Sequence, residues 1–125
     1  MKLTIFLTAI MIAVFGYQIA YVPDAGFFDT YGFSGKNMID RPYVILTSIF
    51  IHGSLTHLLS NIFVMLFFGM AVEKELGWRK MLVIFFLGAV SGDVLSLVVY
   101  PFDAVAIGAS AGIFALVGAG MLLRP

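Results

Sequence analysis

Residues 52–77 read HGSLTHLLSNIFVMLFFGMAVEKELG, an apolar run with polar groups near both ends. From about Thr56 to Glu73 the run is long enough to cross a hydrocarbon core of about 30 Å as a helix. It nevertheless includes His57 and Asn61, four residues apart. Polar side chains inside a membrane span are costly and usually face a bundle interior or a functional site. The stretch therefore predicts a membrane helix with one polar face.

Three other apolar stretches predict further membrane helices. The first runs from Leu3 to Val22 before Pro23 and, with about 20 residues and no small-residue cleavage site, is typical of a retained helix rather than a signal peptide. The remaining two run from Arg79-Lys80 to Val99 and from near Ser110 to Leu123. The sequence thus predicts an all-α, polytopic transmembrane helix bundle with four spans in this chain.

The fourth predicted span is short. Its 14 residues would rise only about 21 Å, too little to cross the whole membrane, so we expect Ser110 to lie below the membrane surface. Backbone that is not helical is tolerated at that depth only inside protein or beside water.

Two stretches between the first and second spans are not long enough to cross a membrane. Residues 23–42 mix glycine, proline, charged and aromatic residues, and we interpret them as a loop in the membrane interface, where aromatic side chains are favoured. Residues 43–51 are apolar and rich in β-branched side chains, and we interpret them as a re-entrant or interfacial piece.

The composition excludes several classes of protein. Of the 125 residues, 62% are hydrophobic and 11% are charged, whereas soluble domains are about half apolar and a quarter charged. The formal net charge is zero, so nothing favours nucleic acid as a partner. The chain has no cysteine and therefore no disulfide or thiolate metal site. We expect an integral multi-pass membrane protein in contact with lipid, without a cofactor or metal.

The basic residues predict the orientation of the spans. Cytoplasmic loops carry an excess of lysine and arginine, so the side with more of them is assigned to the cytoplasm. The side that includes both chain ends holds Lys2, Lys74, Arg79, Lys80 and Arg124, and the other holds Lys36 and Arg41 with four aspartates. We therefore expect both termini in the cytoplasm and Ser110 toward the non-cytoplasmic side.

Two interpretations of His57 and Asn61 stay open at this point. The spacing places them on one helical face. They could hydrogen-bond to neighbouring helices, a contact that contributes about 0.6 kcal/mol on average, or they could form a pair of hydrogen-bond donors in an active site. A metal site is disfavoured, because His52 and His57 do not share a helical face and no carboxylate lies nearby in sequence.

Other polar residues receive plainer interpretations. Asp93 lies about two-thirds along the third span and is more easily explained by protonation, an interfacial position or a bond to a neighbouring helix than by catalysis. Glu73, Lys74 and Glu75 are interpreted as interfacial anchors at the cytoplasmic end of the second span.

Ser110 also allows two interpretations. It lies in the sequence GASAG (residues 108–112), and small residues continue along its helix at Ala115 and Ala119. Gly88, Gly92 and Ser96 recur every four residues on the third span, so close packing of the third and fourth helices is predicted. A serine at a helix start also leaves its hydroxyl and N–H open to a substrate carbonyl, with the helix dipole favouring an oxyanion.

Three segments taken in order resemble the rhomboid family: His52-x4-His57-x3-Asn61, the sequence GMAVEKELG at 69–77, and Gly108-Ala-Ser110. The stretch 43–116 is similar to the second to fourth transmembrane helices of that family. Two departures are Tyr43-Val44 in place of a common Trp-Arg pair, and Ala-Gly after Ser110 in place of the commoner Gly-Ala.

The resemblance implies an intramembrane serine endopeptidase that cleaves transmembrane protein substrates with a Ser-His dyad. Ser110 would be the nucleophile, His57 and Asn61 the oxyanion donors, and His52 a structural residue. In the family the general-base histidine comes from the sixth helix. The resemblance therefore implies that residues 1–125 form an incomplete rhomboid-like transmembrane domain without helices five and six, and that the catalytic histidine lies outside this chain.

Two alternatives remain. A non-proteolytic rhomboid-like protein that binds transmembrane clients would need no general base. An unrelated four-helix membrane protein would use the same polar residues only for packing.

Overall fold

The computed structural model describes residues 1–21 and 26–123, and nearly all of their regular structure is helical. Four long helical stretches are α1 (Lys2–Tyr21), the continuous run α5 (Leu55–Val64), η2 (Met65–Gly69) and α6 (Met70–Leu76), then α7 (Trp78–Val99) and α8 (Ser110–Leu123). Shorter elements are α2 (Gly26–Tyr31), α3 (Gly35–Asp40), α4 (Val44–Thr47) and the 3-10 turn η1 (Ser48–Phe50). The η2 segment is a π-helical turn inside the second long helix.

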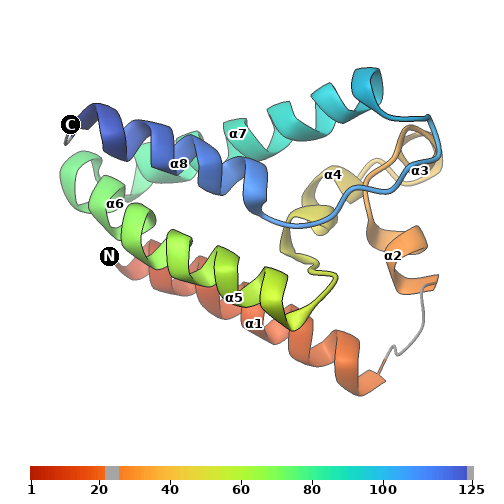
Figure 1. The fold of residues 1–125 in the computed structure, drawn as a ribbon, viewed down its shortest axis with the longest axis horizontal. Coiled ribbons are helices and arrows are strands. Elements are labelled where there is room, and N and C mark those ends of the chain that lie inside the picture. The colour runs from red at the N-terminus through yellow and green to blue at the C-terminus, as the bar shows by residue number, and fades with distance from the viewer. Residues whose placement is uncertain (22–25, 124–125) are drawn as a thin grey trace.

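The long helices lie side by side and reverse direction from one to the next (Figure 1). The beginning of α1 and the end of α8 lie at one end of the bundle, and α2, α3 and the loop before α8 lie at the other. Three of the long helical stretches, at 2–20, 55–76 and 78–99, are long and apolar enough to cross a membrane. The fourth, α8, is apolar but shorter. The predicted all-α bundle is confirmed, with three candidate spans and one short apolar helix.

The helix boundaries agree closely with the sequence-based expectation, except between residues 23 and 42. The segment predicted as the fourth span forms the helix α8, from Ser110 to Leu123, which is apolar but shorter than the three candidate spans. Residues 26–31 and 35–40, expected as loop, form α2 and α3 instead. The reason for α3 is local: the Ser34 side chain accepts a hydrogen bond from the Asn37 N–H at 2.9 Å and so caps the first turn. Residues 22–25 lie outside the described part of the chain.

The predicted close packing of the third and fourth spans is confirmed in the contact between α7 and α8. A methyl group built on Gly92 would lie 2.5 Å from the Ala111 Cβ, and one on Gly88 would lie 2.5 Å from the Ala115 Cβ. A methyl group on Gly112 would lie 2.7 Å from the Phe85 carbonyl oxygen. The two backbones therefore approach to a distance that only small residues allow. This contact fixes the position of α8, and hence of Ser110, against α7.

Glu73 corrects one sequence-based interpretation. Expected as an interfacial anchor, Glu73 is buried, and its carboxylate accepts hydrogen bonds from the first turn of α1. The donors are the Leu3 N–H at 3.0 Å, the Thr4 N–H at 2.9 Å and the Thr4 hydroxyl at 2.7 Å. The first N–H groups of a helix have no partner within the helix, and a carboxylate satisfies them while complementing the helix dipole. Glu73 thus ties α1 to α6.

Replacing Glu73 with alanine is expected to lower the free energy of unfolding by about 1–3 kcal/mol, because buried donors of α1 lose a charged acceptor. Thermal unfolding in detergent micelles measures the change. The exposed neighbour Lys74 provides the control, since Lys74→Ala leaves the α1 contact in place. Equal unfolding midpoints for the two variants would contradict this role of Glu73.

Candidate active site

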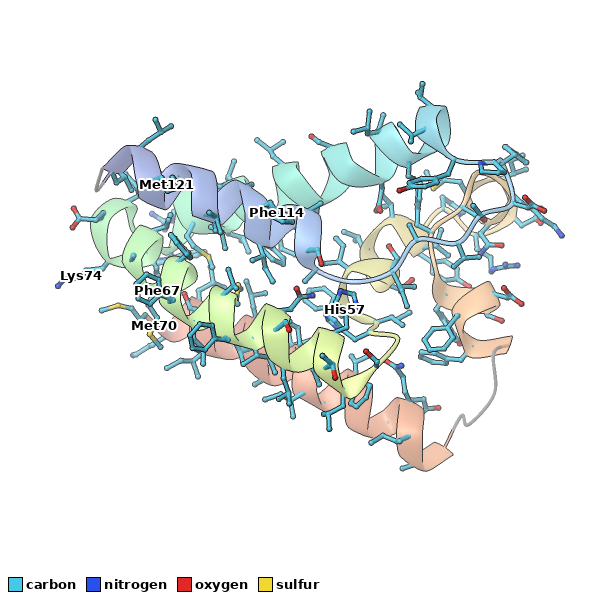
Figure 2. All side chains as sticks on the ribbon, viewed as in Figure 1. His57, Phe67, Met70, Lys74, Phe114 and Met121 are labelled. Carbon is cyan, nitrogen blue, oxygen red and sulfur yellow. The ribbon has the colours of Figure 1, made fainter. Side chains whose placement is uncertain are left out.

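The beginnings of α5 and α8 meet at a cluster of polar side chains. The Nε2 atom of His57 lies 3.2 Å from the Ser110 hydroxyl oxygen. The same hydroxyl lies 3.3 Å from the Asn61 side-chain oxygen and donates its proton to it. Figure 2 shows His57 between the first turns of α5 and α8. The three predicted site residues therefore meet at one point, although Ser110 is 53 residues from His57 and 49 residues from Asn61 in the sequence.

Local structure in α5 places His57 and Asn61 on the side that faces Ser110. The helix begins after Ser54, whose side chain accepts the His57 N–H at 3.1 Å as an N-cap. One turn separates His57 from Asn61, so both side chains project to the same face. Asn61 is buried and His57 is partly exposed.

The loop before Ser110 is held by backbone hydrogen bonds to distant residues. Phe33 and Ala106 exchange a pair of bonds, with N···O distances of 2.9 and 2.7 Å. Further along, the Gly108 N–H donates to the Ser48 carbonyl at 2.8 Å. The segment that contains α2 to η1 therefore positions the entry to α8.

Gly108 has a backbone conformation that other residues rarely adopt. Its φ angle is +104°, and a Cβ atom at this position would lie 2.8 Å from His57 Cε1 and 3.3 Å from His57 Nε2. A glycine is needed here for both reasons: the positive φ strains any L side chain, and the imidazole ring occupies the space. The glycine lets the loop pass against His57 and turn into α8 at Ser110.

The hydrogen bonds around Ser110 have a defined direction. A serine hydroxyl has one proton, and the carbonyl oxygen of an asparagine side chain only accepts. The Ser110 proton therefore points to Asn61, and His57 Nε2–H donates to the Ser110 oxygen. In this arrangement His57 is a donor to the hydroxyl and not its base.

His52, for which the resemblance implies a structural role, contacts the serine cluster through Asn61. Its side chain is fully buried, and its Nε2 atom lies 2.9 Å from the Asn61 side-chain nitrogen. The His52 and His57 rings contact each other edge to face, with centroids 5.1 Å apart. Burial, assisted by the nearby His57, lowers the pKa of His52 to about 4, so the ring is neutral near pH 7.

Gln18 on α1 is not among the predicted site residues, although a glutamine in an otherwise apolar span indicates a functional or packing role. It is buried and binds both backbone groups of His52. Its amide nitrogen donates to the His52 carbonyl at 2.9 Å, and its oxygen accepts the His52 N–H at 3.4 Å.

Asp93 has no part in this cluster: among the described residues, the Ser110 hydroxyl has His57 and Asn61 as its hydrogen-bond partners. Asp93 lies on α7, where its carbonyl accepts the Ser96 hydroxyl at 2.6 Å.

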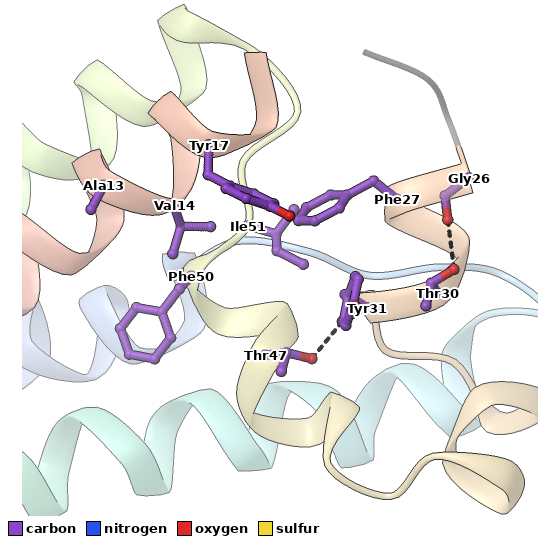
Figure 3. Close-up of a pocket in the computed structure, with 10 residues that line it drawn as sticks. All are labelled: Ala13, Val14, Tyr17, Gly26, Phe27, Thr30, Tyr31, Thr47, Phe50 and Ile51. Carbon is purple, nitrogen blue, oxygen red and sulfur yellow. Dashed lines mark hydrogen bonds between the residues drawn. The ribbon is translucent and has the colours of Figure 1, made fainter. Parts of the chain in front are cut away.

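A cavity of about 780 Å³ lies between α1 and α2, apart from the serine cluster (Figure 3). Its polar side-chain groups are hydroxyls, and two of them are already bonded: Thr47 donates to the Tyr31 carbonyl and Thr30 to the Gly26 carbonyl. The lining contains no histidine or carboxylate, so we do not place the active site there. The lining residues are Ala13, Val14, Tyr17, Gly26, Phe27, Thr30, Tyr31, Thr47, Phe50 and Ile51.

The helical fold and its candidate spans are those of a multi-pass membrane protein, with a serine at a helix start that faces a histidine and an asparagine. Comparison with known families gives the same class. Residues 40–125, which include this whole serine cluster, match the Rhomboid domain. The chain belongs to the rhomboid family.

Several curated proteins are similar to the chain. Rhomboid-like protease 3 of Toxoplasma gondii is 34% identical over 74 residues, 59% of this chain and 28% of that protein. Rhomboid-like protein 11, chloroplastic, of Arabidopsis thaliana is 33% identical over 82 residues, 66% of this chain and 29% of that protein. Rhomboid-like protease 1 of Toxoplasma gondii is 26% identical over 103 residues, 81% of this chain and 35% of that protein. The matched part of the chain thus spans about a third of the length of these relatives.

Proposed function

We propose that the protein is an intramembrane serine endopeptidase that cleaves transmembrane protein substrates, with Ser110 as the nucleophile. The observation that supports this most directly is the Ser110 hydroxyl at 3.2 Å from His57 Nε2 and 3.3 Å from the Asn61 side-chain oxygen. A serine hydroxyl at a helix start, held by a histidine and an asparagine, suits attack on a peptide carbonyl. Membership of a family whose relatives include named proteases supports the same reaction.

Each group has a separate task in the proposed reaction. The Ser110 oxygen attacks the scissile carbonyl carbon while its proton passes to a general base. The carbonyl oxygen becomes an oxyanion. It accepts hydrogen bonds from His57 Nε2–H, from the Ser110 N–H, and from the Asn61 side-chain N–H that does not point to His52. Protonation of the leaving nitrogen then breaks the peptide bond, and water releases the acyl group from Ser110.

The general base is proposed to be a histidine outside residues 1–125. The chain has two histidines, and both have other partners: His57 donates to the Ser110 oxygen, and His52 bonds to Asn61. A residue that donates to the oxyanion is poorly placed to take the serine proton. We expect the base to be supplied by further helices of the rhomboid domain.

The membrane arrangement is part of the proposal. Both termini are placed in the cytoplasm because the basic residues gather on that side, and Ser110 is placed toward the non-cytoplasmic leaflet. Lipid then surrounds the exposed apolar side chains of the bundle.

Labelling with a fluorophosphonate tests the proposal, because this reagent reacts with activated serines. The protein from its whole reading frame, purified in detergent, is expected to be labelled at Ser110, and Ser110→Ala is expected to remove the label. Ser60→Ala, a change on the exposed side of α5, is the matched control and should be labelled like the wild type. A folded protein that is never labelled would instead support a non-proteolytic protein that binds transmembrane clients.

A further inference from the structure

A line of buried polar groups connects α1 to Ser110. It begins at Gln18, which is 6% exposed and bonds to both the carbonyl and the N–H of His52. It continues from the His52 ring to the Asn61 amide, and from Asn61 to the Ser110 hydroxyl. Every group in this line other than the Ser110 hydroxyl is buried. Bonds of this kind are strong in a buried site and costly to leave incomplete.

The contact between His52 and Asn61 fixes the proton on the His52 ring. The amide nitrogen of Asn61, which lies 2.9 Å from His52 Nε2, can only donate. With the amide in this orientation, His52 Nε2 accepts and the ring proton is on Nδ1. The low pKa of His52, about 4, agrees with a neutral ring that offers this acceptor near pH 7.

The same contact selects one orientation of the Asn61 amide. With its nitrogen toward His52, the amide turns its oxygen toward the Ser110 hydroxyl. With the His52 proton on Nδ1, rotation of the amide by half a turn would bring two acceptors, the Asn61 oxygen and His52 Nε2, against each other. We propose that His52 is a positioning residue that sets the orientation of the Asn61 amide at the nucleophile, and that Gln18 holds His52 in place from α1. This inference rests on the proposed function of Ser110.

The orientation matters because it decides which group accepts the hydrogen bond of the Ser110 hydroxyl before the reaction. Held this way, the Asn61 oxygen accepts the hydrogen bond of the Ser110 hydroxyl, and His57 remains a donor to the Ser110 oxygen. If the amide could rotate, the hydroxyl could donate to His57, and the donors would have to reorganise before each reaction. Donors that are fixed in advance stabilise an oxyanion better than donors that must reorganise.

A pair of substitutions at His52 tests the positioning role kinetically. His52→Leu removes the acceptor and is expected to lower the rate of fluorophosphonate labelling at Ser110 at least about tenfold. His52→Gln restores an acceptor oxygen for the Asn61 amide and is expected to recover most of that rate. If His52 had only a structural role, the labelling rates of the two variants would instead follow their thermal unfolding midpoints. That result would overturn the proposal.

A double substitution separates a path through Asn61 from a general loss of structure. In the Asn61→Leu background, His52→Leu is expected to have no further effect on the labelling rate, because its partner is already absent. A full additional loss in the double variant would show that His52 does not act through Asn61.

Histidine NMR tests the same geometry without any activity. Residues 1–125 contain two histidines, and the His52→Leu variant identifies the His52 signals in spectra of ¹⁵N-histidine protein. His52 is expected to carry its proton on Nδ1 at neutral pH, and Asn61→Leu is expected to shift its Nε2 resonance. A His52 ring protonated on Nε2 would overturn the proposal even if Ser110 is labelled. If Ser110 is never labelled, the proposed function fails, and this spectrum still decides the role of His52.

Gln18 provides the last arm of the test. Gln18→Leu removes both bonds to the His52 backbone and is expected to slow the labelling of Ser110 several-fold. The matched control is Thr8→Val on the same helix, because within the described part of the chain the Thr8 hydroxyl bonds only to the Thr4 carbonyl of α1, at 2.8 Å. Equal labelling rates for the two variants would remove Gln18 from the proposal.

Discussion

Gly108→Ala is expected to lower the turnover of a transmembrane substrate by about 100-fold, a loss typical of a misplacement of about 1 Å in a catalytic group. The new methyl group would lie 2.8 Å from His57 Cε1, closer than two carbons approach in contact. The alanine would also have to keep the backbone φ angle of +104°, which strains an L residue by about 1–3 kcal/mol. Either His57 or the turn into α8 must move, and both changes displace Ser110 from its partners.

The measurement is the cleavage rate in proteoliposomes, with the protein from its whole reading frame. Gly53→Ala is the matched control, because Gly53 is next to His52 in sequence and, among the described residues, a methyl group there would meet only Ile107, at an ordinary contact distance of 3.5 Å. Near-normal cleavage by Gly108→Ala, with the same unfolding midpoint as the wild type, would contradict the geometry described for this turn.

The second large effect is expected at His57 and Asn61. Removing one oxyanion donor typically lowers kcat about 10²–10³-fold, so His57→Leu and Asn61→Leu are each expected to lose activity in that range. KM should change little, because these donors act mainly on the transition state. Ser60→Ala, on the exposed side of the same helix, is the control.

His57→Gln distinguishes a donor from a base. A glutamine amide can donate to the oxyanion but cannot take a proton, so substantial activity is expected to remain if His57 is a donor. Complete loss in His57→Gln would instead assign His57 as the general base, in spite of its donor role at the Ser110 oxygen. If Asn61→Leu lowered only the unfolding midpoint and left the cleavage rate unchanged, the packing interpretation of these polar residues would be favoured.

The sequence predicted the helices well because their patterns are local. Long apolar runs, the break at Pro101 and the small residues of α8 each act within one segment, and they placed α7 and α8 within about two residues. The four-residue spacing of His57 and Asn61 likewise determines a shared helical face. The expectation failed at residues 26–40, where glycines and charges suggested a loop although caps such as Ser34 stabilise short helices.

Contacts between segments that are distant in the sequence could not be predicted from local sequence patterns. Glu73 appeared to be a surface anchor, because its charge is at a helix end next to Lys74 and Glu75. Only the packing of α1 against α6 turns it into the acceptor for Leu3 and Thr4. Gln18 and His52 were underestimated for the same reason, since their partners lie 34 and 9 residues away.

The sequence by itself therefore determined the membrane-helix class, the order of the helices and the chemistry available at Ser110, His57 and Asn61. Those features depend on hydrophobicity, helix periodicity and residue type, which any single segment carries. Only the tertiary structure shows that His57 and Asn61 both lie within hydrogen-bond distance of the Ser110 hydroxyl, and that the His52 ring contacts the Asn61 amide. The direction of a hydrogen bond depends on which donor and acceptor meet, and packing alone brings those groups together.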